Sequence, residues 1–300
     1  MNCEIESTIG LPRSAQERAR PKDWNAALAS RLCLAGLAVL FASVVADTVS
    51  FWLHDDNHTH GLFVCAASLG LVWVNRRSLL ALAKSPTAWG LVPLALGLAL
   101  RVSTALLRLE TQSFRIWSIV LVLMGAMLTF HGRDLWRACR FPVLFMLTAG
   151  GVPERLVQHL SGDLQRMSST GAAAAMSALG MPILRNGNLI EIPGCRLEVA
   201  DVCSGIKKLM AMFAFAVFYG YICRLSPARR LLLIAAAIPV AVIANTIRIA
   251  GLIGVCYAGG ERAMAAAHDA AEIVVLAIAY FVFVGFGRAL GCKDIDPSRS

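Results

Sequence analysis

The feature that most limits how this chain can fold is a succession of apolar runs between residues 28 and 287. A transmembrane helix needs roughly 20 mostly apolar residues. The predicted spans are 28–50, 61–75 with a few flanking residues, 88–107, 114–131, 141–152 (a short run containing Pro142), 205–222, 231–258 and 268–287. This pattern predicts an all-α polytopic membrane protein with about eight transmembrane helices.

Composition supports a membrane protein. Hydrophobic residues make up 57% of the chain and charged residues only 16%, whereas soluble domains carry about 25% charged residues. The nine cysteines show no CxxC pair or metal-ligand spacing. Most lie inside apolar runs, where a free thiol packs as a small hydrophobic group, so the pattern argues against a disulfide scaffold. We expect no metal and no cofactor.

The basic residues orient the predicted helices. With the N-terminus in the cytoplasm and one crossing per run, the short external loops hold only Arg108 and Arg262. The cytoplasmic stretches hold Arg13, Arg18, Arg20, Lys22, Arg31, Arg76, Arg77, Lys84, Arg133, Arg137, Arg140, Arg224, Arg229, Arg230, Arg288, Lys293 and Arg299. Cytoplasmic loops of membrane proteins carry such an excess. Both termini are therefore predicted to be cytoplasmic, and the net charge of +9 requires no nucleic acid.

Three regions follow from this topology: a basic tail over 1–25, a single transmembrane domain over 26–290, and a second tail over 291–300. Within the domain, 153–203 is the longest segment without a spanning run, and it falls on the external side as a cap. We expect no cleavable signal peptide, because the first tail is polar.

The cap segment carries two local signals. Residues 154–178 have apolar side chains at helical spacing, which predicts an amphipathic helix on the membrane surface. Gly180 and Pro182 end it. The alternation that follows, around two turn signals, predicts a small extended or hairpin element that leads to Cys203. The apolar stripe of the helix is Leu156, Val157, Leu160, Leu164 and Met167.

Three polar residues that are distant in sequence fall at one depth in this topology. Cys203 opens the sixth span from the external side, and His268 begins the eighth there. Arg248 lies about 25 Å along the seventh span at 1.5 Å per residue. A thiol needs a base or cation to become a thiolate. Histidine supplies acid–base chemistry, and arginine holds a carboxylate or an oxyanion.

Each of these residues also has a purely structural interpretation. Cys203 could pack as a small hydrophobic group, and His268 could be an interfacial histidine without a role. Arg248 could extend to lipid headgroups or pair with Asp269 or Glu272. Lys207 and Lys208 are either headgroup anchors or part of the site. The loop residues His54, Asp55, Asp56, His58 and His60 look like a metal cluster but lack helical ligand spacing, so we predict no metal site.

Four passages resemble the exosortase/archaeosortase family of polytopic membrane cysteine transpeptidases, over about residues 28–290. Residues 57–62 resemble its early histidine loop. Residues 187–194 and 197–206 resemble the segment leading into its Cys-Ser-Gly motif, here Cys203-Ser204-Gly205. Asn245-x-x-Arg248 resembles its Asn-x-x-Arg motif, and 268–272 occupies the place of its final histidine.

The resemblance implies a sorting enzyme of a Gram-negative inner membrane. Its substrates would be exported proteins with a C-terminal tripartite signal: a Pro-Glu-Pro type motif, one transmembrane helix and a basic tail. Cys203 would attack near that motif at the periplasmic face and form a thioester, resolved by an exopolysaccharide-linked or lipid acceptor. Arg248 would bind the substrate carbonyl or the motif's glutamate, and His268 would be the acid and base.

Five further residues are candidates for substrate binding or support: Ser204, Gly205, Asn245, His60 and Glu272. Glu272 stands where the family has glycine, one helical turn from His268, and is expected to orient the imidazole or to pair with Arg248.

Two other functions remain open from the sequence. The chain could be a transporter, or a non-catalytic component of polysaccharide assembly, with Arg248 holding an anionic substrate. Transporters often consist of two related halves, and residues 28–150 and 151–290 show no repeat.

Overall fold

The computed structural model describes residues 24–55, 58–107, 111–150, 154–187, 189–198, 206–223 and 225–292. The chain divides into two units, residues 1–45 and 46–300, and the boundary lies within helix α2. The described helices are α2 (Trp24–His54), α3 (His60–Val74), α4 (Arg76–Leu80), η1 (Ala88–Gly90), α5 (Leu91–Leu106), α6 (Gln112–Ala126), η2 (Met127–His131), α7 (Arg133–Phe145), η3 (Met146–Gly150), α8 (Glu154–Ala178), α9 (Ile206–Ile222), α10 (Pro227–Ala235) and α11 (Ala237–Ala289).

Four helical stretches in the described residues are long and apolar enough to cross a membrane: Leu28–His54, Ala88–Leu106, Gln112–His131 and Pro227–Ala289. Their outward faces carry large apolar side chains such as Leu106 and Phe281, each 78% exposed, as lipid contact requires. The prediction of a mainly helical membrane protein is confirmed. The number of eight spans stays a prediction, because two predicted runs form shorter helices, His60–Val74 and Lys208–Ile222, and 141–152 is divided between α7 and η3.

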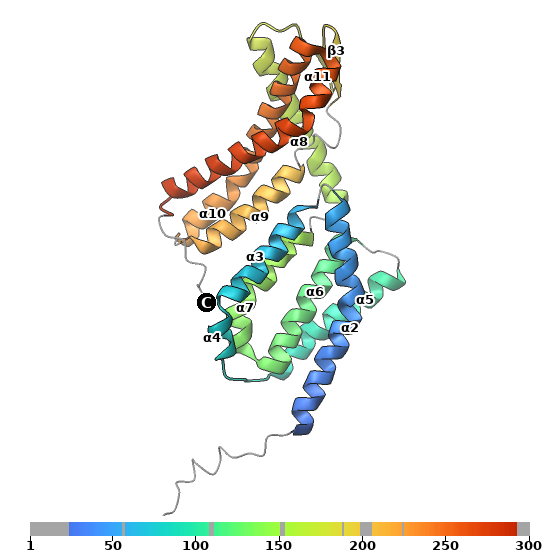
Figure 1. Ribbon diagram of the computed structural model, residues 1–300, viewed down its shortest axis with the longest axis vertical. Helices are drawn as coiled ribbons and strands as arrows, with labels where there is room; N and C mark the ends of the chain where they lie inside the picture. Colours follow the sequence, from blue (N-terminus) through green and yellow to red (C-terminus); the bar gives the residue numbers. More distant parts are fainter. Residues whose placement is uncertain are drawn as a thin grey trace, which may run out of the picture. The chain divides into compact units, whose positions relative to one another are not determined.

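Helix α11 contains a sharp reversal at Gly260. This residue has φ 75° and ψ −175° inside an otherwise helical stretch. Arg248 and His268, 20 residues apart, would be separated by about 30 Å along a straight helix, yet their side chains are 2.8 Å apart. The chain therefore turns back on itself at Gly260 (Figure 1). Residues 259–267, predicted as an external loop, are instead helical apart from Gly260. Their external location stays a prediction.

Between α8 and α9 lies a three-stranded antiparallel sheet, β1 (Leu184–Asn186), β2 (Leu189–Ile192) and β3 (Cys195–Glu198), in the order β1-β2-β3. Ile190 faces Leu197 across β2 and β3. The predicted helix over 154–178 and the extended element after it are confirmed, with one strand more than a hairpin. Gly180 ends the helix with a positive φ of 85°.

Helix α8 packs closely against α11, with Gly171, Ala172 and Met176 on the contacting side. The apolar stripe predicted from the sequence is only partly the buried face, because Leu164 is buried but Met167 is 59% exposed. Small side chains let two helices approach closely, and a Cβ on Gly171 would lie 3.1 Å from Thr246 Cγ2 on α11. The buried face of α8 consists of Leu164, Gln165, Ser168, Ser169, Ala172, Ala173 and Met176.

The cysteine pattern argued against a disulfide scaffold, but the structure joins four of the cysteines in two disulfides. Cys195 is bonded to Cys256, and Cys223 to Cys292, with Cα–Cα distances of 6.2 and 5.3 Å. The partners are 61 and 69 residues apart, so local spacing could not reveal them. Among the described cysteines, Cys33, Cys65 and Cys139 are free thiols.

Candidate functional site

The reversal of α11 brings a buried arginine against a histidine and a glutamate. Arg248 is 1% exposed. Its Nη2 donates to Nε2 of His268 at 2.8 Å and lies 3.0 Å from Oε2 of Glu272. The two hydrogens of this one nitrogen thus serve both partners. Of the alternatives that the sequence left open for Arg248, the structure shows the pairing with Glu272.

The contact defines the state of the imidazole. A guanidinium only donates hydrogen bonds, so Nε2 of His268 is the acceptor. The ring in this geometry is the neutral tautomer with its proton on Nδ1. Arg248 therefore holds the histidine in the form that can accept a proton, but it also occupies the nitrogen that would accept it.

A second cation completes the cluster. Lys208, near the start of α9, is 2% exposed, and its Nζ lies 3.8 Å from Oε1 of Glu272. The glutamate carboxylate, 18% exposed, therefore lies between two buried cations contributed by α9 and α11. With a neutral His268, Arg248, Lys208 and Glu272 carry one net positive charge. The sequence left open whether Lys208 anchors headgroups or belongs to the site, and the structure brings it into the cluster.

Part of the guanidinium has no acceptor among the residues that the structure describes. Nε and Nη1 of Arg248 are buried and make no hydrogen bond to the residues that the structure describes. A buried donor left without a partner costs about 1–3 kcal/mol. This edge of Arg248 is suited to an oxygen from a carbonyl or a carboxylate.

Asn245 lies one helical turn before Arg248 on the same buried face of α11, and it is 1% exposed. The candidates Cys203, Ser204 and Gly205 lie outside the described residues, between the end of β3 and the start of α9.

In the described residues, the early histidine loop contacts η3 and also pairs within itself. His60 begins α3, and its Nε2 is 3.2 Å from the carbonyl oxygen of Thr148 in η3. Nearby, Trp52 Nε1 donates to the carbonyl of Ala149 at 3.3 Å. His58 pairs with Asp55 at 3.0 Å. Within the described residues, the contact of His60 with Thr148 links α3 to η3. The described residues contain no group of three ligands placed to hold a metal.

Comparison with known protein families gives a match over most of the chain. A family model described as a transmembrane exosortase (Exosortase_EpsH) matches residues 52–285. No curated protein and no solved structure matches the chain. The matched range includes α3 through most of α11, and with them Arg248, His268 and Glu272.

Proposed function

Because the chain belongs to the transmembrane exosortase family, whose membership suggests a membrane sorting transpeptidase, we propose that it cleaves the C-terminal sorting signal of exported proteins through a cysteine thioester. Its substrates carry a Pro-Glu-Pro type motif, a transmembrane helix and a basic tail. The observation that carries this proposal is the cluster of Arg248, His268 and Glu272, in which a buried guanidinium keeps one edge open.

Cys203 is the nucleophile in this proposal. Its Sγ loses a proton to His268 and attacks the carbonyl carbon of the scissile bond. The C–N bond breaks, His268 returns the proton to the leaving amine, and the substrate remains as a thioester on Sγ. An acceptor nucleophile linked to exopolysaccharide or lipid then attacks the thioester carbonyl and releases the thiolate.

Arg248 has two tasks in this scheme. Its open Nε and Nη1 edge binds the substrate carbonyl or the glutamate of the motif. Its Nη2 has to leave Nε2 of His268 before that nitrogen can accept the thiol proton. A substrate oxygen that draws the guanidinium away therefore frees the base at the moment when it is needed. The reaction takes place at the periplasmic face of the inner membrane, where the substrate's own helix presents the bond.

The test uses the full-length protein in membrane vesicles with a reporter that ends in the tripartite signal. We expect Cys203→Ala to abolish cleavage, and Arg248→Lys to lower it on the order of 10²-fold, because lysine cannot donate to several acceptors in one plane. Hydroxylamine should capture the thioester in the wild type as a C-terminal hydroxamate.

Two matched controls accompany these variants. Cys65→Ala removes a free thiol on α3, and Arg262→Lys changes an exposed arginine on α11. Both should cleave at the wild-type rate. Cleavage that survives in Cys203→Ala would refute the proposal and favour a transporter or an assembly component.

A further inference from the structure

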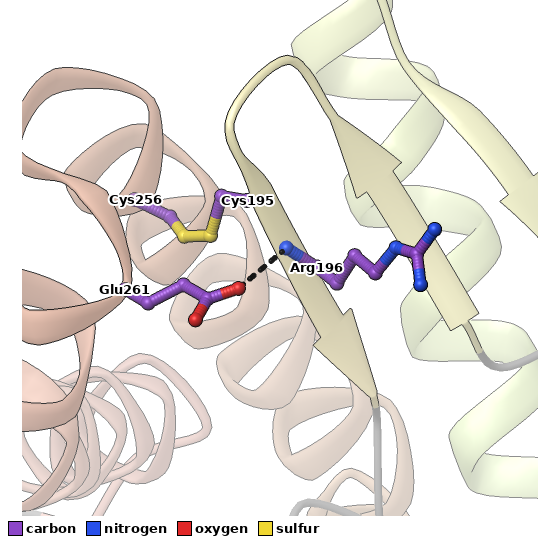
Figure 2. Close-up of a disulfide and its surroundings, with 4 residues drawn as sticks. All are labelled: Cys195, Arg196, Cys256 and Glu261. Carbon is purple, nitrogen blue, oxygen red and sulfur yellow. Dashed lines mark hydrogen bonds between the residues drawn. A yellow bond between two sulfur atoms is a disulfide. The ribbon is translucent and has the colours of Figure 1, made fainter.

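Strand β3 is attached to α11 on both sides of its reversal. Cys195, the first residue of β3, is bonded to Cys256, four residues before Gly260. The backbone N–H of Arg196 donates to Oε1 of Glu261, immediately after Gly260, at 3.4 Å. Figure 2 shows the disulfide and this hydrogen bond side by side along β3. One short strand thus holds both arms of the turn.

The surroundings of the disulfide are apolar and closely packed. Cys195 and Cys256 are 4% and 2% exposed. They belong to a buried cluster that joins the sheet, α8 and α11. Its other members are Ala172, Met176, Ile190, Ile192, Leu197, Ile249, Leu252 and Ile253.

The Cys195–Cys256 bond joins two segments of the chain that lead to residues of the proposed site. Cys195 precedes Cys203 by eight residues, and Cys256 follows Arg248 by eight residues. His268 lies on the arm after Gly260, to which β3 is attached through Glu261. Strand β3, from which the chain continues to Cys203, is therefore covalently attached to the hairpin that carries Arg248 and His268.

We propose that the Cys195–Cys256 disulfide is a positioning element of the site, which keeps the strand leading to Cys203 against the hairpin of Arg248 and His268. This rests on the proposed function and extends it, since it makes the enzyme dependent on an oxidising compartment. The bond forms by thiol–disulfide exchange with a disulfide-donor protein: the two thiols lose two protons and two electrons, and the donor disulfide becomes a dithiol.

The second disulfide provides a matched control when the purified proteins are oxidised beforehand, so that both bonds are formed. Cys223 and Cys292 are joined across a similar sequence separation and are likewise buried, but they pack in a different cluster, with Met212, Leu233 and Phe283. The experiment compares the full-length wild type with the double variants Cys195→Ser/Cys256→Ser and Cys223→Ser/Cys292→Ser in detergent micelles. Three quantities are measured: reporter cleavage, the alkylation rate of Cys203 by iodoacetamide (read from its own peptide by mass spectrometry), and the thermal unfolding midpoint.

We expect the Cys195/Cys256 variant to lose at least tenfold in kcat and fivefold in Cys203 alkylation rate, while the Cys223/Cys292 variant stays within twofold in both. Reductant should lower the wild type and the control variant to the level of the Cys195/Cys256 variant without lowering the latter further. Oxidised glutathione should restore both. If the Cys195/Cys256 variant does not fold, reduction of the folded wild type supplies the same comparison.

Unchanged kcat and unchanged Cys203 alkylation after loss of the Cys195–Cys256 bond would overturn the inference. The inference would also be overturned if kcat fell only in proportion to thermal stability and the control variant showed the same fall. The alkylation rate does not require a cleaved substrate, so it separates this inference from the proposed function, which fails on its own if Cys203→Ala still cleaves.

Discussion

Glu272 is the residue on which the charge balance of the site depends. Its two carboxylate oxygens each lie near a different buried cation, Arg248 at 3.0 Å and Lys208 at 3.8 Å. Burying a cation is costly unless an opposite charge lies close to it. The remaining positive charge suits an anionic thiolate or a tetrahedral oxyanion, so the same glutamate that stabilises the cluster leaves it cationic enough for the proposed chemistry.

Glu272→Gln should therefore destabilise the protein by about 3 kcal/mol, because it leaves two buried cations without an anion between them. Adding Lys208→Met should restore part of this loss, since only one cation then needs a partner. Chemical unfolding of the single and double variants gives the coupling energy. Asp269→Asn, an exposed acid on the same helix, should change stability by less than about 0.5 kcal/mol. Additive effects in the double variant would contradict the ion pairs.

The hairpin of α11 is the element that assembles the site. The sequence predicts its arms as two separate spans, 231–258 and 268–287, and the break between them contains Gly259-Gly260. The backbone at Gly260, with φ 75° and ψ −175°, is in a region that is essentially restricted to glycine. The position of Arg248 against His268 thus depends on one residue that has no side chain.

Gly260→Ala should destabilise the protein by about 1–3 kcal/mol through backbone strain and should lower cleavage, because the arms can no longer meet in register. Gly251→Ala is the matched control, as a Cβ there has no atom within 4 Å. Alanine inside a helix is favoured over glycine by about 1 kcal/mol, so this variant should be as stable as the wild type or more so. Thermal unfolding and reporter cleavage measure both. Wild-type cleavage by Gly260→Ala would show that the turn is not needed.

The two disulfides allow the predicted orientation of the protein in the membrane to be tested. The distribution of Lys and Arg predicts that Cys195 and Cys256 lie on the external side, and that Cys223 and Cys292 lie on the cytoplasmic side. Disulfides persist in the periplasm, whereas the cytoplasm keeps thiols reduced. In cells, we therefore expect the pair Cys195 and Cys256 to be oxidised and the pair Cys223 and Cys292 to be reduced.

In intact cells, we expect Cys195 and Cys256 to resist thiol labelling until a reductant is added. Cys223 and Cys292 should label as thiols once the membrane is made permeable. Mass spectrometry of the four cysteine peptides, with acid-trapped thiols, reads both states. The reverse pattern would place the segment 153–203 in the cytoplasm and would contradict the predicted topology.

Local patterns were sufficient for much of this protein. Apolar runs predicted its membrane helices, because about 20 apolar residues are needed wherever a helix crosses lipid. Helical spacing and Gly180 predicted α8 over 154–178, and the residue types of Arg248 and His268 in an apolar context marked them as candidates for a site. These properties depend on neighbours along the chain, so they can be read without knowing how distant segments pack.

Long-range packing accounts for the rest. On α8, Leu164 of the predicted apolar stripe is buried but Met167 is exposed, because segments distant in sequence decide which face of the helix is covered. Lys208 joins Glu272, and Cys195 joins Cys256, across 64 and 61 residues respectively. No periodicity or spacing encodes such pairs, since they exist only once the reversal at Gly260 has brought β3, α9 and both arms of α11 together.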